Sequence, residues 1–281
     1  MTPSMNRDRL LSSLVMAVAL ATGAAIPARA QITWTNYTTG SGLANNIVRG
    51  VYATGSTIYA ATQGGLSIST DGGVSWTSRT SANSGLVSNA VYGVYAAGST
   101  MYAATGGGLS ISTNNGTSWT TYTTGSGLGD DQVNGVYAAG STIYAATDGG
   151  LSISTNNGTT WTTSGTTNGL GNDRVWGVFA AGGAIYAATD GGGLSISTNN
   201  GTNWTSYTIG SGLGSNVVNG VYAQGSTIYA ATNGGLSVGV EAVPEPSTYA
   251  MALAGLACGT WHLRRRRERL HHLFRFSSTA A

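Results

Sequence analysis

The sequence predicts an all-β fold, a five-bladed β-propeller of four-stranded blades whose ring is closed by the N-terminal strand completing the last blade. Three observations predict it. Tryptophans at positions 34, 76, 119, 161 and 204 fall 42 or 43 residues apart, a period typical of arrays of one supersecondary unit. Each unit holds four short apolar segments separated by Gly, Ser and Asn, which predicts four strands. The last repeat also lacks its fourth strand, whereas the first repeat is preceded by a segment that matches such a strand.

The four strands are clearest in the first repeat, where we expect them at 48–53, 57–62, 66–70 and 75–79. The second of them is apolar on both faces, with Ile58 and Ala60 on one side and Tyr59 and Ala61 on the other. A sheet with two apolar faces needs cover on both sides. A propeller supplies that cover because each sheet lies between two neighbours.

The blade count follows from how the repeats begin and end. Each copy starts near a leucine: Leu43, Leu86, Leu128, Leu170 and Leu213. The fifth copy stops at Val240 without its last turn and outer strand, whereas residues 33–38 (TWTNYT) match residues 118–123 (SWTTYT). We therefore expect the N-terminal segment to complete the fifth blade. Closure would also remove exposed sheet edges, which an open stack of sheets would leave bare.

The turn between the third and fourth strands carries a resemblance. Residues 69–76 read STDGGVSW, and later copies place Asn114, Asn156 and Asn199 where the first has Asp71. This resembles the Asp-box hairpin of sialidases and many other propellers. Asp or Asn can bond its own hairpin backbone there, so we expect a folding role. The run GLxxNxVxGVYA also resembles propeller repeats of bacterial two-component sensor ectodomains, which implies a fold and not an activity.

The composition of the chain limits the classes of partner that it can bind. The chain has 281 residues, of which 44 are Gly and 8% are charged, against about 25% charged in typical soluble domains. Residues 31–243 hold three Arg, six Asp and one Glu, a net charge of −4. Nucleic-acid binding requires clustered Lys and Arg, so no nucleic-acid partner is expected. The only cysteine, Cys258, lies outside the repeats, which excludes a disulfide framework.

The N-terminus has the pattern of a secretory signal. Arg7 and Arg9 precede an apolar run at 10–26, and Ala28 and Ala30 supply the small residues that signal peptidase recognises. We expect residues 1–30 to be a signal peptide and residues 31–242 to be the propeller. A retained membrane anchor is the alternative, and it is disfavoured because polar residues interrupt the apolar run.

The C-terminus combines Pro244, Glu245 and Pro246 with an apolar stretch at 249–263 and four arginines at 264–267. This order resembles the PEP-CTERM sorting signal, which would occupy residues 243–281. The resemblance implies export, transient inner-membrane anchoring by a short transmembrane helix and cutting by an exosortase. It further implies delivery to the envelope, outer surface or extracellular matrix of a Gram-negative bacterium, typically one that makes exopolysaccharide. A 15-residue helix spans about 22 Å, less than the roughly 30 Å hydrocarbon core. The 268–281 tail departs from the family pattern, and an ordinary membrane tail is the alternative.

A candidate ligand-binding site follows from comparing the repeats with each other. Alternating strand direction puts the loops that enter the first strands on one face of the disc, and those loops carry most of the differences between copies. One candidate set immediately precedes the Gly of each first strand: Arg49, Tyr92, Asn134, Trp176 and Asn219. A second set lies three residues earlier: Asn46, Asn89, Asp131, Asp173 and Asn216. Facing hairpins add Gln63, Asp148, Asp190 and Asn233.

These residues would rim the central channel with aromatic, amide and acidic groups. The mixture suits a polysaccharide, because aromatic rings offer flat apolar faces and amides and carboxylates match vicinal hydroxyls. The alternative is that the amides cap loops and that Tyr92 and Trp176 plug the channel. Aspartates in the third and fourth repeats could hold Ca²⁺, but no EF-hand spacing supports a metal site, and no cofactor is expected.

No catalytic residues are expected. Residues 31–242 contain no histidine, which excludes the usual catalytic triads and most zinc sites. Nothing in the sequence singles out a pair of carboxylates for glycoside hydrolysis. The arginines Arg49, Arg79 and Arg174 occupy different repeat positions, unlike a sialidase cluster. We therefore expect an exported, non-catalytic binder of polysaccharide or of a surface protein. The alternatives are a structural matrix component, with Ser and Thr as glycan acceptors, and a sialidase-like glycosidase.

Overall fold

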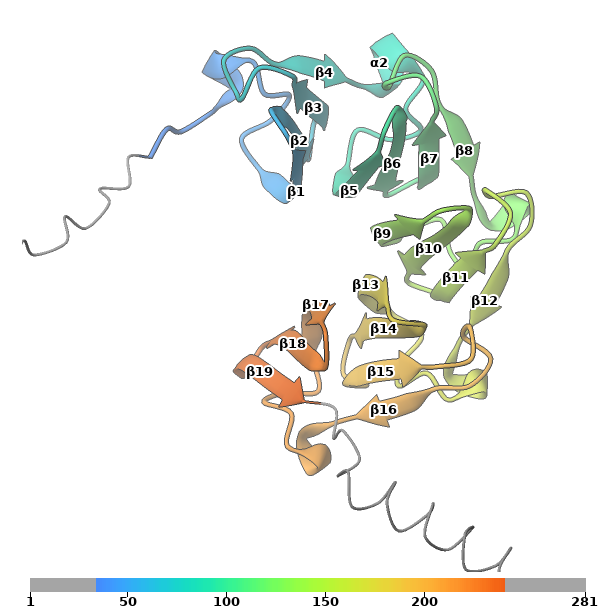
Figure 1. Ribbon diagram of the computed structural model, residues 1–281. Coiled ribbons are helices and arrows are strands. Elements are labelled where there is room, and N and C mark those ends of the chain that lie inside the picture. The colour runs from blue at the N-terminus through green and yellow to red at the C-terminus, as the bar shows by residue number, and fades with distance from the viewer. Residues whose placement is uncertain (1–33, 241–281) are drawn as a thin grey trace, which may run out of the picture. The chain divides into compact units, whose positions relative to one another are not determined.

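The computed structural model describes residues 34–240 and shows the predicted all-β architecture of repeated antiparallel sheets (Figure 1). The chain divides after Asn36 into two units, and the described residues of the first, Trp34–Asn36, form neither strand nor helix. The second unit contains five sheets, four with four strands and the fifth with three. The predicted signal peptide and sorting signal lie outside the described residues.

Each sheet is a meander whose strands pair in chain order. The first sheet comprises β1 (Val48–Thr54), β2 (Thr57–Thr62), β3 (Gly65–Ser69) and β4 (Thr77–Arg79). The second comprises β5 (Val91–Ala97), β6 (Thr100–Thr105), β7 (Gly108–Ser112) and β8 (Thr120–Tyr122). The third comprises β9 (Val133–Ala139), β10 (Thr142–Thr147), β11 (Gly150–Ser154) and β12 (Thr162–Ser164).

The fourth sheet comprises β13 (Val175–Ala181), β14 (Ala184–Thr189), β15 (Leu194–Ser197) and β16 (Thr205–Tyr207). The fifth comprises β17 (Val218–Gln224), β18 (Thr227–Thr232) and β19 (Gly235–Val240). A single helical turn, not predicted from the sequence, precedes each sheet: η1 (Thr39–Ser41), α2 (Ser81–Ser84), η2 (Thr124–Ser126), η3 (Thr166–Asn168) and η4 (Ile209–Ser211). Each ends at a glycine in the left-handed region.

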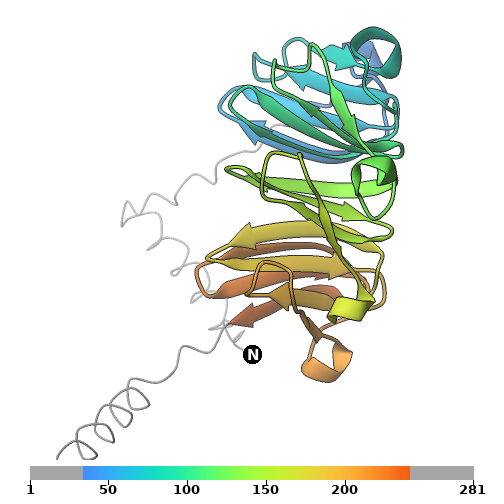
Figure 2. The same ribbon diagram turned by 90° about the vertical axis from the view of Figure 1, so that its right-hand side faces the viewer.

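The core lies between successive sheets, which follow one another in chain order (Figures 1 and 2). Four apolar clusters fill these four interfaces. Between the first and second sheets, for example, Leu66 of β3 packs with Leu86 and Val91 of the next repeat, and all three are almost wholly buried. This arrangement explains why the second strand of each repeat is apolar on both faces.

The first strands of the five sheets contact one another through a row of aromatic rings. One ring from each sheet contacts the next at centroid separations of 4.9–5.1 Å: Tyr52, Tyr95, Tyr137, Phe179 and Tyr222. Tilted rings at this separation stabilise beyond their buried area. Burial, together with the neighbouring tyrosines, raises the pKa of Tyr95 above its usual value.

The first and fifth sheets are not packed on each other. No apolar cluster among residues 34–240 joins them, and the faces that closure would cover are exposed, at 70% for Val51, 68% for Leu236 and 56% for Val238. The segment Trp34–Thr38 is not a strand in the structure, and the last strand of the fifth sheet, β19, pairs on one side with β18. Ring closure by the N-terminal strand therefore stays a prediction.

The turn between the third and fourth strands is held by one serine and one Asp or Asn. In the first repeat the Ser69 hydroxyl donates to Asp71 Oδ1 at 2.8 Å and accepts the Gly73 N–H at 2.8 Å. Asp71 Oδ1 also accepts the Ser75 N–H at 2.9 Å. The later copies repeat these bonds with Asn114, Asn156 and Asn199. The side chain bonds its own hairpin as expected, and Ser75 belongs to the turn, which is why β4 starts at Thr77.

Asp71 gives the turn of the first repeat a titratable group that the equivalent turns, which have Asn114, Asn156 and Asn199, do not contain. Hydrogen bonds from the Ser75 hydroxyl, the Ser75 N–H and the Ser69 hydroxyl lower the pKa of Asp71 from 3.8 to about 2. A carboxyl whose pKa is lower in the folded state contributes stability above its unfolded pKa and loses it as the pH falls through the folded value. We therefore expect an extra loss of stability between about pH 4 and pH 2.

The measurement is the melting temperature from pH 7 to pH 2 for the wild type and for Asp71→Asn. Asn performs the same role in three other turns, so the two proteins should melt alike at pH 7. Below pH 4 the wild type should lose stability faster than the variant, because only the wild type must protonate this carboxylate. Parallel curves down to pH 2 would contradict the role assigned to Asp71.

Candidate functional site

The first candidate set occupies an equivalent irregularity in every sheet. Strand pairing between the first and second strands shifts register around one residue, which is left without a Cα partner. These bulge residues are Arg49, Tyr92, Asn134, Trp176 and Asn219. A β-bulge redirects a side chain out of the regular alternation and occurs preferentially beside functional sites. That these residues rim a central channel stays a prediction.

The glycine after each bulge residue brings neighbouring first strands together. A Cβ on Gly50 would lie 3.0 Å from the Tyr92 carbonyl oxygen, and one on Gly135 would lie 3.0 Å from that of Trp176. The backbone of one bulge residue therefore rests on the glycine of the preceding repeat. This close approach sets the bulge residues of the first four repeats side by side. We call Arg49, Tyr92, Asn134 and Trp176 the bulge row.

At its Asn134 and Trp176 end, the bulge row contacts a charged network on the third and fourth sheets. Asn134 Nδ2 donates to Asp148 Oδ1 at 2.8 Å and to the Val175 carbonyl at 2.9 Å. Arg174 forms ion pairs with Asp148 at 3.3 Å and with Asp190 at 3.4 Å. Its guanidinium carbon also lies 5.7 Å from the centroid of the Trp176 ring. The two hairpin carboxylates thus hold the arginine over the indole.

A smaller arrangement of the same kind lies on the first two sheets. The Arg49 guanidinium lies 5.9 Å from the centroid of the Tyr92 ring, and its Nη2 is 3.5 Å from Gln63 Oε1. No carboxylate is paired with Arg49 among the described residues. The bulge row is therefore positive at its Arg49 end, and at its other end it contacts an arginine that is paired with two aspartates. In the fifth sheet Asn219 donates to Asn233 at 2.9 Å.

The second candidate set caps the helical turns. Each side-chain oxygen accepts the first N–H of the turn seven or eight residues earlier, at 2.7–2.9 Å; the acceptors are Asn46, Asn89, Asp131, Asp173 and Asn216. These bonds fix the loops that enter the first strands. The set supports the loops that carry the bulge row, and this role matches the loop-capping alternative that the sequence left open.

Sequence reasoning missed Arg174 as the centre of the site. It lies three residues before the glycine that recurs in the first strand of every repeat, and the other copies have Ile, Ala, Gln and Val at that position. Comparison of the repeats alone could therefore have singled it out as a charge at an otherwise uncharged position. Trp176 is half-buried, and its Nε1 has no hydrogen-bond partner within residues 34–240. Arg79 lies elsewhere, with its Nε 3.3 Å from the place of a Cβ on Gly116. The described arginines do not form a sialidase-like cluster.

Two further observations concern metals and membranes. In the part of the chain that the structure describes, no three His, Cys, Asp or Glu side chains gather where they could hold a metal ion. The helices of the same part are all too short to cross a bilayer. The expected C-terminal transmembrane helix at 249–263 lies outside these residues.

Two parts of the sequence match known families. Residues 107–196 match the family described as DUF6242 beta propeller domain, and residues 242–267 match the PEP-CTERM protein-sorting motif. The second match coincides with Pro244, Glu245, Pro246 and the four arginines, and it implies export with processing by an exosortase. No curated protein matches the chain.

Solved structures share the fold. The extracellular domain of a B. thetaiotaomicron protein assigned as a hybrid two component system is similar at 20% identity with a TM-score of 0.61, over 73% of this chain and 30% of that chain. The extracellular domain of a protein from the same organism assigned as a one component system shares 19% identity with a TM-score of 0.58, over 74% and 28%. An ancestral GH74 enzyme shares 22% identity with a TM-score of 0.55, over 66% and 27%. The chain thus spans about 30% of their length, and the likeness extends to the propeller fold alone.

Proposed function

We propose that this exported β-propeller is a non-catalytic binding protein of the cell envelope or extracellular matrix, and that its bulge row binds a polysaccharide. The observation that carries the proposal is the row itself, in which Tyr92 and Trp176 each lie beneath an arginine and beside polar hairpin groups. The sorting motif supports a location where polysaccharide is available.

The chemistry of the row suits vicinal hydroxyls better than catalysis. Arg174 presents donors in a planar fork, while Asp148 and Asp190 present acceptors beside it. Half-buried aromatic rings add apolar surface against which the C–H faces of a sugar can pack. Asp148 and Asp190 are both ion-paired with the Arg174 guanidinium, whereas the two carboxyl groups of a glycosidase flank the scissile bond as acid and as nucleophile or base.

The test is a glycan-array screen of the exported chain, with and without Ca²⁺, repeated with Trp176→Ala. Truncating an aromatic anchor typically costs about 2 kcal/mol or more of binding free energy, so we expect the variant's affinity to fall by about 30-fold or more. The melting temperature should change little, because Trp176 is only half-buried and its Nε1 has no partner among the described residues to lose.

Tyr207→Ala is the matched control, because Tyr207 is a 43% exposed aromatic on the outer strand β16, which is not part of the bulge row. Binding should survive this change. A large loss of stability in Trp176→Ala would instead support the alternative that Trp176 has a structural role and fills the channel. A blank array in both conditions would overturn the polysaccharide proposal and favour a surface-protein ligand or a structural matrix role.

A further inference from the structure

The outer strand of the third sheet ends in a serine, whereas the outer strands of the other complete sheets end in an arginine or a tyrosine. These last residues are equivalent because each pairs with a leucine of the third strand: Arg79 with Leu66, Tyr122 with Leu109, Ser164 with Leu151, and Tyr207 with Leu194. The third repeat therefore lacks a large side chain at this position.

In the two preceding interfaces, the large residue lies against the turn of the following repeat. Tyr122 contacts Trp161, with ring centroids 5.7 Å apart, and a Cβ on Gly158 would lie 2.8 Å from the Tyr122 Cζ. Between the first and second sheets, a Cβ on Gly116 would lie 3.3 Å from the Arg79 Nε. A large side chain thus occupies the space between the outer strand and the next turn in both interfaces.

Ser164 leaves a pocket in the equivalent space between the third and fourth sheets. Its side chain is buried, and its hydroxyl donates to the Gly201 carbonyl at 2.7 Å. The pocket beside it measures about 370 Å³, which is within the size range of small-molecule sites. Its wall includes Ile153, Thr155, Thr162, Ser164 and Asn168 of the third repeat and Asn200 of the fourth.

The pocket offers free hydrogen-bonding groups and no charge. Thr155, Thr162 and Asn200 are exposed, and their side chains have no hydrogen-bond partner within residues 34–240. Asn168 Oδ1 accepts the Gly165 N–H at 3.2 Å, which leaves the Asn168 Nδ2 as a donor. None of the residues that line the pocket is charged, so a charged ligand group would meet no counter-ion there.

We propose that this pocket is a second carbohydrate site, which binds one neutral sugar residue of a polysaccharide. A pyranose ring is close in size to the tyrosine ring that occupies the equivalent space one interface earlier. Its hydroxyls donate and accept hydrogen bonds, as the threonine hydroxyls and asparagine amides of the pocket do, and its C–H groups can pack on Ile153. The pocket adjoins β12, the outermost strand of its sheet, whereas the bulge row lies on the innermost strands. The inference is therefore independent of the bulge row.

The test is an NMR titration of the exported chain with neutral malto-, cello- and manno-oligosaccharides, in a Trp176→Ala background that removes binding at the bulge row. We expect the backbone amide signals of Ser164 and Asn200 to shift. Ser164→Tyr introduces the residue found at this position in the second and fourth repeats, so it should abolish the shifts without lowering the melting temperature. Ser81→Tyr is the matched control, because Ser81 is exposed on α2, and binding should survive it.

A second variant leaves the pocket open and removes one of its hydrogen-bonding groups. Asn200 has a φ of 57°, and Asn157, its equivalent in the preceding turn, has a φ of 55°, so glycine can replace either without backbone strain. Asn200→Gly should weaken oligosaccharide binding about tenfold. Asn157→Gly, in the turn that contacts Tyr122, should leave binding unchanged.

Three results would overturn the proposal. One is equal binding by Ser164→Tyr and Ser81→Tyr, and another is the absence of amide shifts with every neutral oligosaccharide. The third is a shift of the Ser164 and Asn200 amides with N-acetyltyrosinamide but not with the oligosaccharides, which would favour a protein partner that inserts a tyrosine.

Discussion

Replacing Leu151 by alanine is expected to lower the free energy of unfolding by about 2–5 kcal/mol. Leu151 lies on β11, is wholly buried, and packs in the cluster between the third and fourth sheets with Val175 and Trp204. Removing its side chain leaves a cavity that the flanking sheets cannot fill, because each is held by its neighbour on the other side. Urea denaturation, read as a shift in midpoint at unchanged slope, measures the loss.

Ile209→Ala is the control for this prediction. Ile209 begins η4 and is 61% exposed, so its replacement should change the free energy of unfolding by no more than about 0.5 kcal/mol. Equal effects of the two substitutions would mean that the interface between the third and fourth sheets does not carry the stability of the fold.

Replacing Gly149 by alanine is expected to destabilise the protein by about 1–3 kcal/mol and to disturb the bulge row. A Cβ at this position would overlap the carbonyl oxygen of Gly129, in the loop that enters the same sheet. The clash is with backbone, so no side chain can turn away to relieve it. The hairpin that must move also carries Asp148, which bonds Asn134 and Arg174.

Glycan affinity and melting temperature should therefore both fall in Gly149→Ala. Gly125→Ala is the control, because a Cβ there would lie 3.5 Å from the Thr123 hydroxyl, an ordinary contact. All five repeats have glycine at the Gly149 position, whereas Ala44 and Val87 replace Gly129 in the first two. A stable Gly149→Ala protein would show that the two loops can separate without cost.

The repeat, its four strands and the two-sided sheets could be predicted from the amino-acid sequence, because these features depend on local periodicity and turn chemistry. Strand ends agree with the structure within two residues; the largest difference is at β4, where the hydrogen bonds of Asp71 hold Ser75 in the turn. The bulge residues were also predictable, because the same offset from a glycine recurs in every copy.

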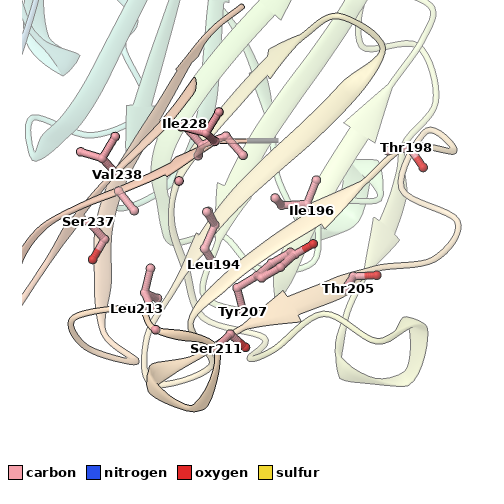
Figure 3. Close-up of a pocket in the computed structure, with 14 residues that line it drawn as sticks. Leu194, Ile196, Thr198, Thr205, Tyr207, Ser211, Leu213, Ile228, Ser237 and Val238 are labelled. Carbon is pink, nitrogen blue, oxygen red and sulfur yellow. The ribbon is translucent and has the colours of Figure 1, made fainter. Parts of the chain in front are cut away.

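How these residues act together depends on contacts between sheets, which the sequence did not reveal. Arg174 forms ion pairs with Asp148 and Asp190, which lie on hairpins of two different sheets. No spacing within one repeat predicts these contacts. The second candidate set proved to cap turns, since Asp173 reaches the Thr166 N–H across a loop. The cavity of about 650 Å³ lined by Leu194, Tyr207 and Val238 lies between the fourth and fifth sheets (Figure 3), where the apolar cluster has no counterpart of Trp119, Trp161 or Trp204. Contacts between sheets depend on packing, and packing is set by the whole array and not by any one unit.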